Sequence, residues 1–264
     1  MINVKKLSII ALVLLLVGGI GSAFTFSQVT DHEVAKVEKT ISDVVTDINI
    51  DTDNAAVEVI PTKDEESRVE LVSKGVEISK LDFTAEVEGK KLTVKLKDRH
   101  TFSIGFHIQS LHLRVYVPEK AYESFAVKSD NGKVQVSDLQ SEHVKVISHN
   151  GRIELNDILA KVVEVDSSNG AVELNHVEGK LVGSSNNGKI TLITKGLDRM
   201  IDFESDNGKI MIITENEPTN TTFEVSVDNG KIDILGKYEG STVIGKGENL
   251  VKLETNNGKI EVTK

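Results

Sequence analysis

Short runs of alternating hydrophobic and polar residues cover most of the chain, and from Asn131 onward they recur around one phrase. The phrase is Asn-Gly followed by a basic residue in six of its seven copies, and then by Val or Ile in all seven. Successive copies begin 19, 19, 18, 20, 22 and 28 residues apart. Alternation over a few residues predicts half-buried strands, and a period near 20 predicts a repeat array.

Each repeat is predicted to be a strand, an Asn-Gly corner, a second strand and a second corner. Gly tolerates positive φ and Asn visits the left-handed region more readily than most residues, so we expect them to turn the chain. The predicted corners are Asn131 and Gly132, Asn150 and Gly151, Asn169 and Gly170, Asn187 and Gly188, Asn207 and Gly208, Asn229 and Gly230, and Asn257 and Gly258.

Residues of similar type recur at equivalent positions around the corners, and we call each such set of positions a column. Two residues before each Asn the chain carries Ser129, Ser148, Ser167, Ser185, Ser205, Val227 and Thr255. Around Asn150 the expected inward residues are Val144, Val146, Ile153, Leu155 and Ile158, and later units repeat this set. Asn-Gly is also the strongest hairpin signal, so an antiparallel meander is the alternative. Constant columns favour stacking, because equivalent side chains then lie above one another.

The fold class expected from this pattern is all-β: a single-stack, β-helix-like β-solenoid of coils of about 19–20 residues with Asn-Gly corners, preceded by one N-terminal transmembrane helix. Residues 40–128 are expected to form its less regular N-terminal part, and residues 129–264 the regular repeats. Asn54-Ala55 resembles a degenerate corner. Glu88-Gly89-Lys90 fits either the corner of an imperfect coil or an ordinary hairpin, and the sequence leaves both open.

The N-terminal 39 residues predict a membrane anchor. Residues 1–6 form an expected cytoplasmic tail, the uncharged residues 7–26 are long enough to span a bilayer, and residues 27–39 form a polar juxtamembrane spacer. The lysines at 5 and 6 place the tail inside and the body outside, a single-pass cell-membrane localisation. The alternative is a cleaved signal peptide, with Ala23 at a plausible cleavage site.

The last coil ends at Lys264 with no visible cap. An unpaired edge needs protection, so we expect a bulky residue, an intramolecular loop or a partner strand to cover it. The long insertion before the last Asn-Gly, residues 236–250, is the candidate loop.

Composition narrows the function. The chain has 264 residues, a formal net charge of −10 and no cysteine. The negative balance argues against nucleic-acid binding, and the lack of cysteine excludes disulfides, thiolate metal sites and cysteine nucleophiles. The histidines are scattered, and the repeat is about twice the length of a calcium-binding one, so no metal, cofactor or catalytic residue is expected.

One column remains free to contact a ligand. Stacking would bring together six cations that follow the corner glycines, about 4.8 Å apart, where they could contact a polyanion such as a teichoic acid. They are Lys133, Arg152, Lys189, Lys209, Lys231 and Lys259. The alternative is a solvated column offset by the acidic residues two positions on, among them Glu154, Glu173, Asp233 and Glu261.

The recurrent Ser-x-Asn-Gly-Lys-Ile-x-Ile pattern, the segment Val115-Tyr116-Val117-Pro118 and the N-terminal apolar run resemble a bacterial putative-adhesin family of unknown function, which includes LiaG-like membrane-anchored envelope-stress proteins. The resemblance covers about residues 40–264. It implies an extracytoplasmic β-solenoid linked to the cell-envelope stress response, with no catalytic residues to carry over.

The function expected from the sequence is therefore a membrane-anchored, non-enzymatic, adhesin-like interaction module. Its expected partners are the membrane, through the N-terminal helix, and another envelope protein or a cell-wall polymer. The alternative is a carbohydrate-active β-helix enzyme, which would need two carboxylates flanking one glycosidic bond.

Overall fold

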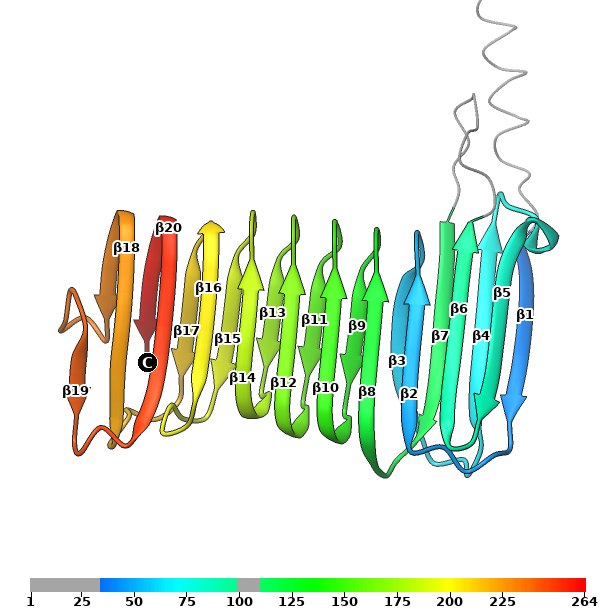
Figure 1. Cartoon of the computed structure of the whole chain (residues 1–264), viewed down its shortest axis with the longest axis horizontal. Helices are drawn as coiled ribbons and strands as arrows, with labels where there is room; N and C mark the ends of the chain where they lie inside the picture. The colour runs from blue at the N-terminus through cyan, green and yellow to red at the C-terminus, as the bar shows by residue number, and fades with distance from the viewer. Residues whose placement is uncertain (1–33, 99–109) are drawn as a thin grey trace, which may run out of the picture.

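The computed structural model describes residues 34–98 and 110–264. Within them 20 strands form one sheet, and the only helix is a three-residue 3-10 helix. The molecule is elongated, with the N-terminal strands at one end and β18 and β19 at the other (Figure 1). The all-β class expected from the alternating pattern is therefore correct.

The N-terminal part contains β1 (Val34–Ile41), β2 (Asp47–Thr52), β3 (Ala56–Thr62), β4 (Ser67–Lys74), η1 (Ile78–Lys80), β5 (Leu81–Glu88), β6 (Lys91–Asp98) and β7 (Ser110–Pro118). The repeat region contains β8 (Ala121–Ser129), β9 (Val134–Ser137), β10 (Gln140–Ser148), β11 (Ile153–Asn156), β12 (Leu159–Ser167), β13 (Val172–Asn175), β14 (Glu178–Ser185), β15 (Ile190–Thr194), β16 (Ile201–Asn207), β17 (Ile210–Thr214), β18 (Thr221–Ile234), β19 (Thr242–Ile244) and β20 (Asn249–Thr263).

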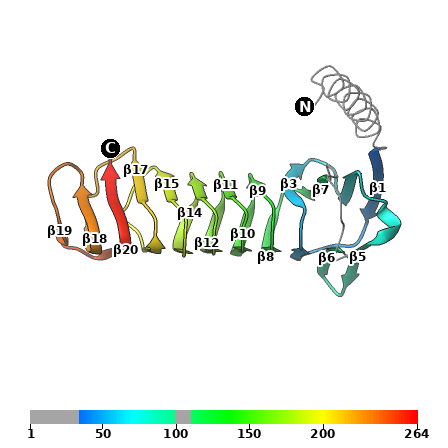
Figure 2. The same cartoon turned by 90° about the horizontal axis from the view of Figure 1, so that it is seen from above.

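The repeat region forms two facing layers of parallel strands. In the first layer β8, β10, β12, β14 and β16 pair in that order. In the second layer β9, β11, β13, β15 and β17 do the same. Figure 2 shows the layers as two rows, with each coil contributing one strand to each. Parallel pairing between successive coils excludes the antiparallel meander for this region, because a meander pairs consecutive strands.

The N-terminal part adds antiparallel strands to both layers. β2 continues the first layer beside β8, and β3 continues the second beside β9. Beyond β2 lie β6 and then β5, which is antiparallel to β6. Beyond β3 lie β7, β4 and β1, and the β7–β4 and β4–β1 pairs are antiparallel. Glu88 lies opposite Lys91, with Gly89 at a φ of 63° between them, so this segment is a hairpin and not a coil corner.

β18 and β20 each run through both layers, and their order in the stack is the reverse of their order in the sequence. β20 pairs with β16 and β17 on one side and with β18 on the other. The last coil in sequence therefore lies inside the stack, and β18 is the outermost coil. β19 pairs with the first residues of β18 in antiparallel orientation. Part of the insertion at residues 236–250 thus covers β18, as expected if an intramolecular loop protects the end of the stack. The protected edge, however, belongs to the coil of β18 and not to the last coil of the sequence.

The core lies between the two layers. The inward residues expected around Asn150 and Asn169 are buried, as are Ile201, Phe203, Ile210 and Ile212. The exceptions are Val225 and Ile232 of β18, which are only partly buried. They occupy the same columns as fully buried residues in other coils, but β18 has no further coil beyond it.

Asparagine side chains form a continuous hydrogen-bonded ladder along the first corner. Each amide nitrogen donates to the amide oxygen of the neighbouring coil, at 2.8 to 3.1 Å. The spatial order is Asn54, Asn131, Asn150, Asn169, Asn187, Asn207, Asn257 and Asn229. Asn54 therefore takes the place of a corner residue although Ala55 follows it. Ladders of stacked amides are a known stabilising feature of parallel strand stacks.

The expected role of the corner glycines needs correction. Among them only Gly132 has a positive φ, of 147°. The others are required by close approach: a Cβ on Gly151 would lie 1.7 Å from the carbonyl oxygen of Gly132, and equivalent contacts occur at Gly170, Gly188, Gly208, Gly230 and Gly258. Positive φ occurs instead at the second corner, at Asp138, Asp157 and His176.

The fold class predicted from the sequence is wrong in its overall form. The described residues do not make a single stack of uniform coils behind a helix. They form one nearly closed 20-stranded sheet in which antiparallel strands extend the N-terminal end and β18 and β20 join the layers. Backbone pairing between distant segments decides this arrangement, and the repeat period carries no information about it. The repeats themselves remain solenoid-like.

The predicted membrane helix and localisation are also corrected. No helix within residues 34–98 and 110–264 is long and apolar enough to cross a membrane. The span expected at residues 7–26 lies outside the described residues, and β1 begins at Val34, inside the stretch expected as a spacer. The expected single-pass cell-membrane localisation is therefore not supported by the part of the chain that the structure describes.

Candidate functional site

The six cations after the corner glycines lie along the outer face of the second layer, and we call them the cation column. Their coils are adjacent: the backbone of Val134 donates to Arg152, that of Ile190 donates to Lys209, and Lys231 lies opposite Lys259. Ala171 interrupts the column between Arg152 and Lys189. Adjacent strands are about 4.8 Å apart, so the column presents charges at a regular short spacing.

Carboxylates two residues further on neutralise part of this column. Lys133 forms an ion pair with Glu154 at 2.6 Å, and Arg152 lies 3.7 Å from both Glu154 and Glu173. Further along, Lys209 and Lys259 both bind Glu261. Hydrogen bonds from these two lysines lower the pKa of Glu261 to about 2, so it remains ionised at neutral pH.

Two cations of the column differ from the rest. Within the part of the chain that the structure describes, Lys189 and Lys231 have no carboxylate within ion-pair distance, and both are exposed. Thr191 takes the place of the carboxylate beside Lys189, and Met211 takes it beside Lys209. The uncompensated charge therefore lies at the start of β15 and again in β18.

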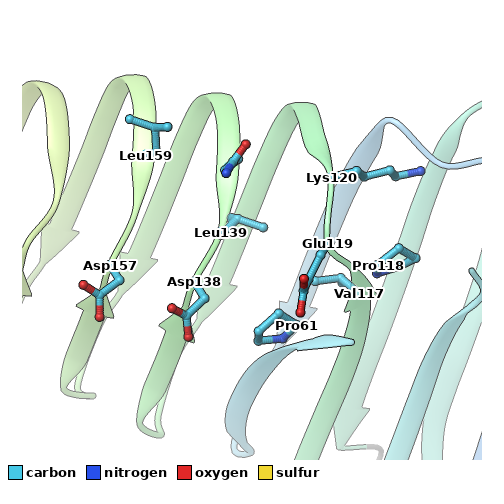
Figure 3. A pocket seen from close by; sticks show the side chains of 10 residues that line it. Pro61, Val117, Pro118, Glu119, Lys120, Asp138, Leu139, Asp157 and Leu159 are labelled. Atoms are coloured by element: carbon cyan, nitrogen blue, oxygen red, sulfur yellow. The ribbon is translucent and has the colours of Figure 1, made fainter. Parts of the chain in front are cut away.

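A groove of about 540 Å³ lies where the N-terminal part meets the repeats. It arises because β3 is longer than β9: Val59 still pairs with Val136, but Pro61 pairs only with β7. Figure 3 shows Pro61 and Glu119 at one side of this groove, and Asp138 and Asp157 on successive coils at the other. Pro61 has no N–H to offer to an added strand, so this edge is protected against strand pairing.

The chemistry of the groove differs from that of the cation column. Its apolar wall includes Leu139 and Leu159, while its rim carries Glu119, Asp138 and Asp157. The Asp157 side chain is 62% exposed. Such exposure does not suit a general acid, which needs burial to hold its proton near neutral pH. These three carboxylates outnumber the one cation of the lining, Lys120, so the rim would repel the polyanion considered for the column.

Sequence reasoning named the cations of the column and the loop at residues 236–250, but it did not find the cavity that this loop forms with β18. Residues 235–244 fold back on β18, and a second cavity there, of about 560 Å³, includes Lys231, Lys237 and Tyr238. The 28-residue interval before the last Asn-Gly was the available signal. Within the described residues no group of three or more His, Cys, Asp or Glu side chains could hold a metal ion.

The fold and the column define a class: repetitive all-β proteins whose stacked coils present regular outward columns of side chains. The chain belongs to the Toastrack DUF4097 family, whose family model matches residues 45–263. This match confirms the resemblance to a putative-adhesin family of unknown function. No curated protein matches the chain.

Several solved structures are similar to the chain at low identity. A putative adhesin from Bacteroides fragilis is 13% identical, covers 87% of this chain and 97% of its own, and has a TM-score of 0.49. A putative cell adhesion protein from Clostridium sporogenes is 13% identical, with coverages of 88% and 99% and a TM-score of 0.42. A putative lipid binding protein from Parabacteroides distasonis is 13% identical, with coverages of 88% and 97% and a TM-score of 0.42.

Proposed function

We propose that this protein is a non-enzymatic, adhesin-like module that binds an anionic surface polymer along the cation column. One observation carries the proposal: six cations lie on one face, on every repeat coil except that of Ala171, and two of them, Lys189 and Lys231, lack a partner carboxylate among the described residues. An extended polyanion with charges along its length could replace the missing carboxylates. The partially neutralised column predicts modest affinity, because exposed ion pairs contribute about 0.2–1 kcal/mol each.

Binding of teichoic-acid fragments to the purified protein tests this proposal. We expect saturable binding that weakens as salt rises from about 50 to 200 mM, since exposed charges are screened over about 10 Å at 0.1 M salt. Lys189→Gln should weaken binding about two- to fivefold, corresponding to one exposed ion pair. The matched control is Lys145→Gln, which removes the same charge from the first layer, where Lys145 pairs with Glu164.

Two results would contradict the proposal. Equal weakening by Lys189→Gln and Lys145→Gln would mean that overall charge, and not the column, governs binding. Release of shortened glycan fragments from peptidoglycan or teichoic acid would instead identify a carbohydrate-active enzyme.

The resemblance to envelope-stress proteins adds a finer proposal, that this binding serves the cell-envelope stress response. The transcript should then rise when cells meet an antibiotic that blocks cell-wall synthesis. An unchanged transcript, measured beside a known stress-induced transcript as a control, would separate the protein from that response without affecting the binding proposal.

A further inference from the structure

The outermost coil of the stack has an incompletely covered core. Val225 and Ile232 of β18 are partly buried, whereas the residues beside them in β20, Leu253 and Ile260, are fully buried. The chain after β18 turns back and covers this end in part: Tyr238 pairs with Ile234 in antiparallel orientation. In Figures 1 and 2 this end of the molecule lies opposite the end that carries β1.

The turn itself is held in an uncommon backbone conformation. Leu235 has a φ of 58° and Gly236 a φ of 64°, and the Lys237 and Tyr238 amides both donate to the Ile234 carbonyl oxygen. The left-handed region costs a non-glycine residue about 1–2 kcal/mol, so surrounding contacts must impose it on Leu235. One such contact is the hydrogen bond from the Leu235 amide to the Val262 carbonyl at 2.7 Å. The result is a defined hairpin, which fixes where Lys237 and Tyr238 lie.

The hairpin, β18 and Lys259 of β20 line an open cavity of about 560 Å³, which we call the end pocket. This volume falls within the range of about 300–1,000 Å³ that is usual for small-molecule sites. Its polar and aromatic lining consists of three cations, two carboxylates and one aromatic ring: Lys231, Lys237, Lys259, Asp233, Glu239 and Tyr238.

The cations of the end pocket are not equally available. Lys259 binds Glu261 at 2.7 Å, and Lys237 lies 3.5 Å from Glu217. Lys231 has no carboxylate within ion-pair distance among the described residues. Asp233 accepts a hydrogen bond from the Gly236 amide at 3.0 Å, which orients its carboxylate at the turn. The pocket therefore offers one uncompensated cation, two further cations and one oriented acceptor, Asp233.

We infer that the end pocket binds a sugar residue that carries a carboxylate or a phosphate. The lysines suit the anionic group, and the Tyr238 ring offers an apolar face of the kind that packs against a sugar ring. Asp233 and Glu239 can accept hydrogen bonds from sugar hydroxyls. An inorganic anion would not need the ring or the acceptors, and a neutral sugar would not need the cations.

This inference rests on the proposed function and deepens it, because the pocket continues the cation column at its outer end. The column would hold the length of an anionic polymer, and the end pocket would hold one of its sugar residues. The pocket lies at the end of the molecule away from β1. The N-terminal strands therefore do not block the approach of a ligand that is attached to another surface.

The experiment measures binding of two probes to the full chain by titration calorimetry: a disaccharide that ends in glucuronate, and glucose 6-phosphate. Cellobiose and inorganic phosphate are the comparison ligands. The variants are Lys231→Gln and Tyr238→Ala, with Tyr238→Phe to retain the ring. Lys189→Gln is the matched control, since it also removes an unpaired cation of the column but lies outside the pocket.

We expect saturable binding of at least one anionic sugar, with weaker or no binding of cellobiose and inorganic phosphate. Lys231→Gln and Tyr238→Ala should each weaken it about tenfold or more, whereas Tyr238→Phe and Lys189→Gln should change it less than about threefold. Circular dichroism and the thermal midpoint of each variant establish that it is folded. Which of the two probes binds identifies the anionic group.

Three outcomes would overturn the inference. The first is the absence of saturable binding of both anionic sugars. The second is competition by cellobiose or inorganic phosphate at the same concentration as the anionic sugar. The third is equal weakening of binding by Lys231→Gln and Lys189→Gln with no effect of Tyr238→Ala, which would leave the column proposal intact and remove the pocket from it.

Discussion

The side-chain amide of Asn257 donates a hydrogen bond to the side-chain oxygen of Asn207, 2.9 Å away, although 50 residues separate them in the chain. Asn229, which lies between them in sequence, instead donates to Asn257 from the outer side at 3.1 Å. The asparagine ladder therefore records the order of the coils in space and not their order in the chain. An exchange of β18 and β20 would put Asn229, and not Asn257, beside Asn207.

The ladder predicts a position-dependent effect of asparagine substitutions. Asn150 takes part in two ladder hydrogen bonds and Asn229 in one. Each such bond contributes about 0.5–1.5 kcal/mol, so Asn150→Ala should lower the free energy of unfolding about twice as much as Asn229→Ala. Urea denaturation followed by circular dichroism measures both. An equal effect at the two positions would show that the amides act locally at their own corners.

The corner glycines predict a severe effect of one methyl group. Gly151→Ala would place a Cβ 1.7 Å from the Gly132 carbonyl oxygen, and backbone atoms cannot move away without breaking the ladder. We expect a loss of about 3 kcal/mol or more, at the upper end of overpacking effects. Gly196→Ala is the control, because nothing lies within 4 Å of its added Cβ. Similar thermal midpoints for the two variants would contradict close approach as the reason for glycine.

One core contact between adjacent coils predicts compensation. Gly183 lies opposite Phe203, and a Cβ on Gly183 would be 2.8 Å from the Phe203 ring. Gly183→Val should therefore destabilise by about 1–3 kcal/mol through overpacking, and Phe203→Val should destabilise by leaving a cavity. The double variant should be more stable than the sum of the single effects implies, by about 1 kcal/mol or more. Additive effects in a double-mutant cycle of urea unfolding would count against this packing.

The hydrogen bonds that Asp198 accepts predict a pH-dependent contribution of this residue to stability. Partial desolvation of its carboxylate disfavours ionisation, but hydrogen bonds from Thr219, Asn220 and Thr221 outweigh this effect and lower the pKa of Asp198 to about 2. A carboxyl whose pKa is lowered by folding stabilises the protein fully above its unfolded pKa, near 3.9. That stabilisation is lost as the pH falls toward about 2.

Asp198→Asn should accordingly cost about 1 kcal/mol at pH 7, a value kept small because the carboxylate is solvent-exposed. The difference from the wild type should shrink as the pH approaches 2. Thermal midpoints measured from pH 7 to pH 2 provide the test. Asp43→Asn, at an exposed position outside this hydrogen-bond cluster, is the control. A constant difference over the whole range would mean that Asp198 acts through packing and not through its charge.

The sequence alone identified the features that depend on neighbouring residues. The alternating pattern specified which side chains of the repeats face inward, because successive residues of a strand point to opposite faces. The period located the Asn-Gly corners and the column of cations. These features depend on residues that are close together in the chain, and the same pattern occurs in seven copies, which strengthens the prediction.

Only the tertiary structure decided which strand pairs with which. The edge formed by β16 and β17 pairs with β20 and not with β18, although both carry Asn-Gly-Lys-Ile. With β20 in the inner position, the segment that contains β19 lies against the free edge of β18 and covers part of it. Near-identical repeats present near-identical backbone edges, so their order depends on such long-range contacts. Contacts between coils also place Gly151 against Gly132, neutralise most of the cation column and form the end pocket.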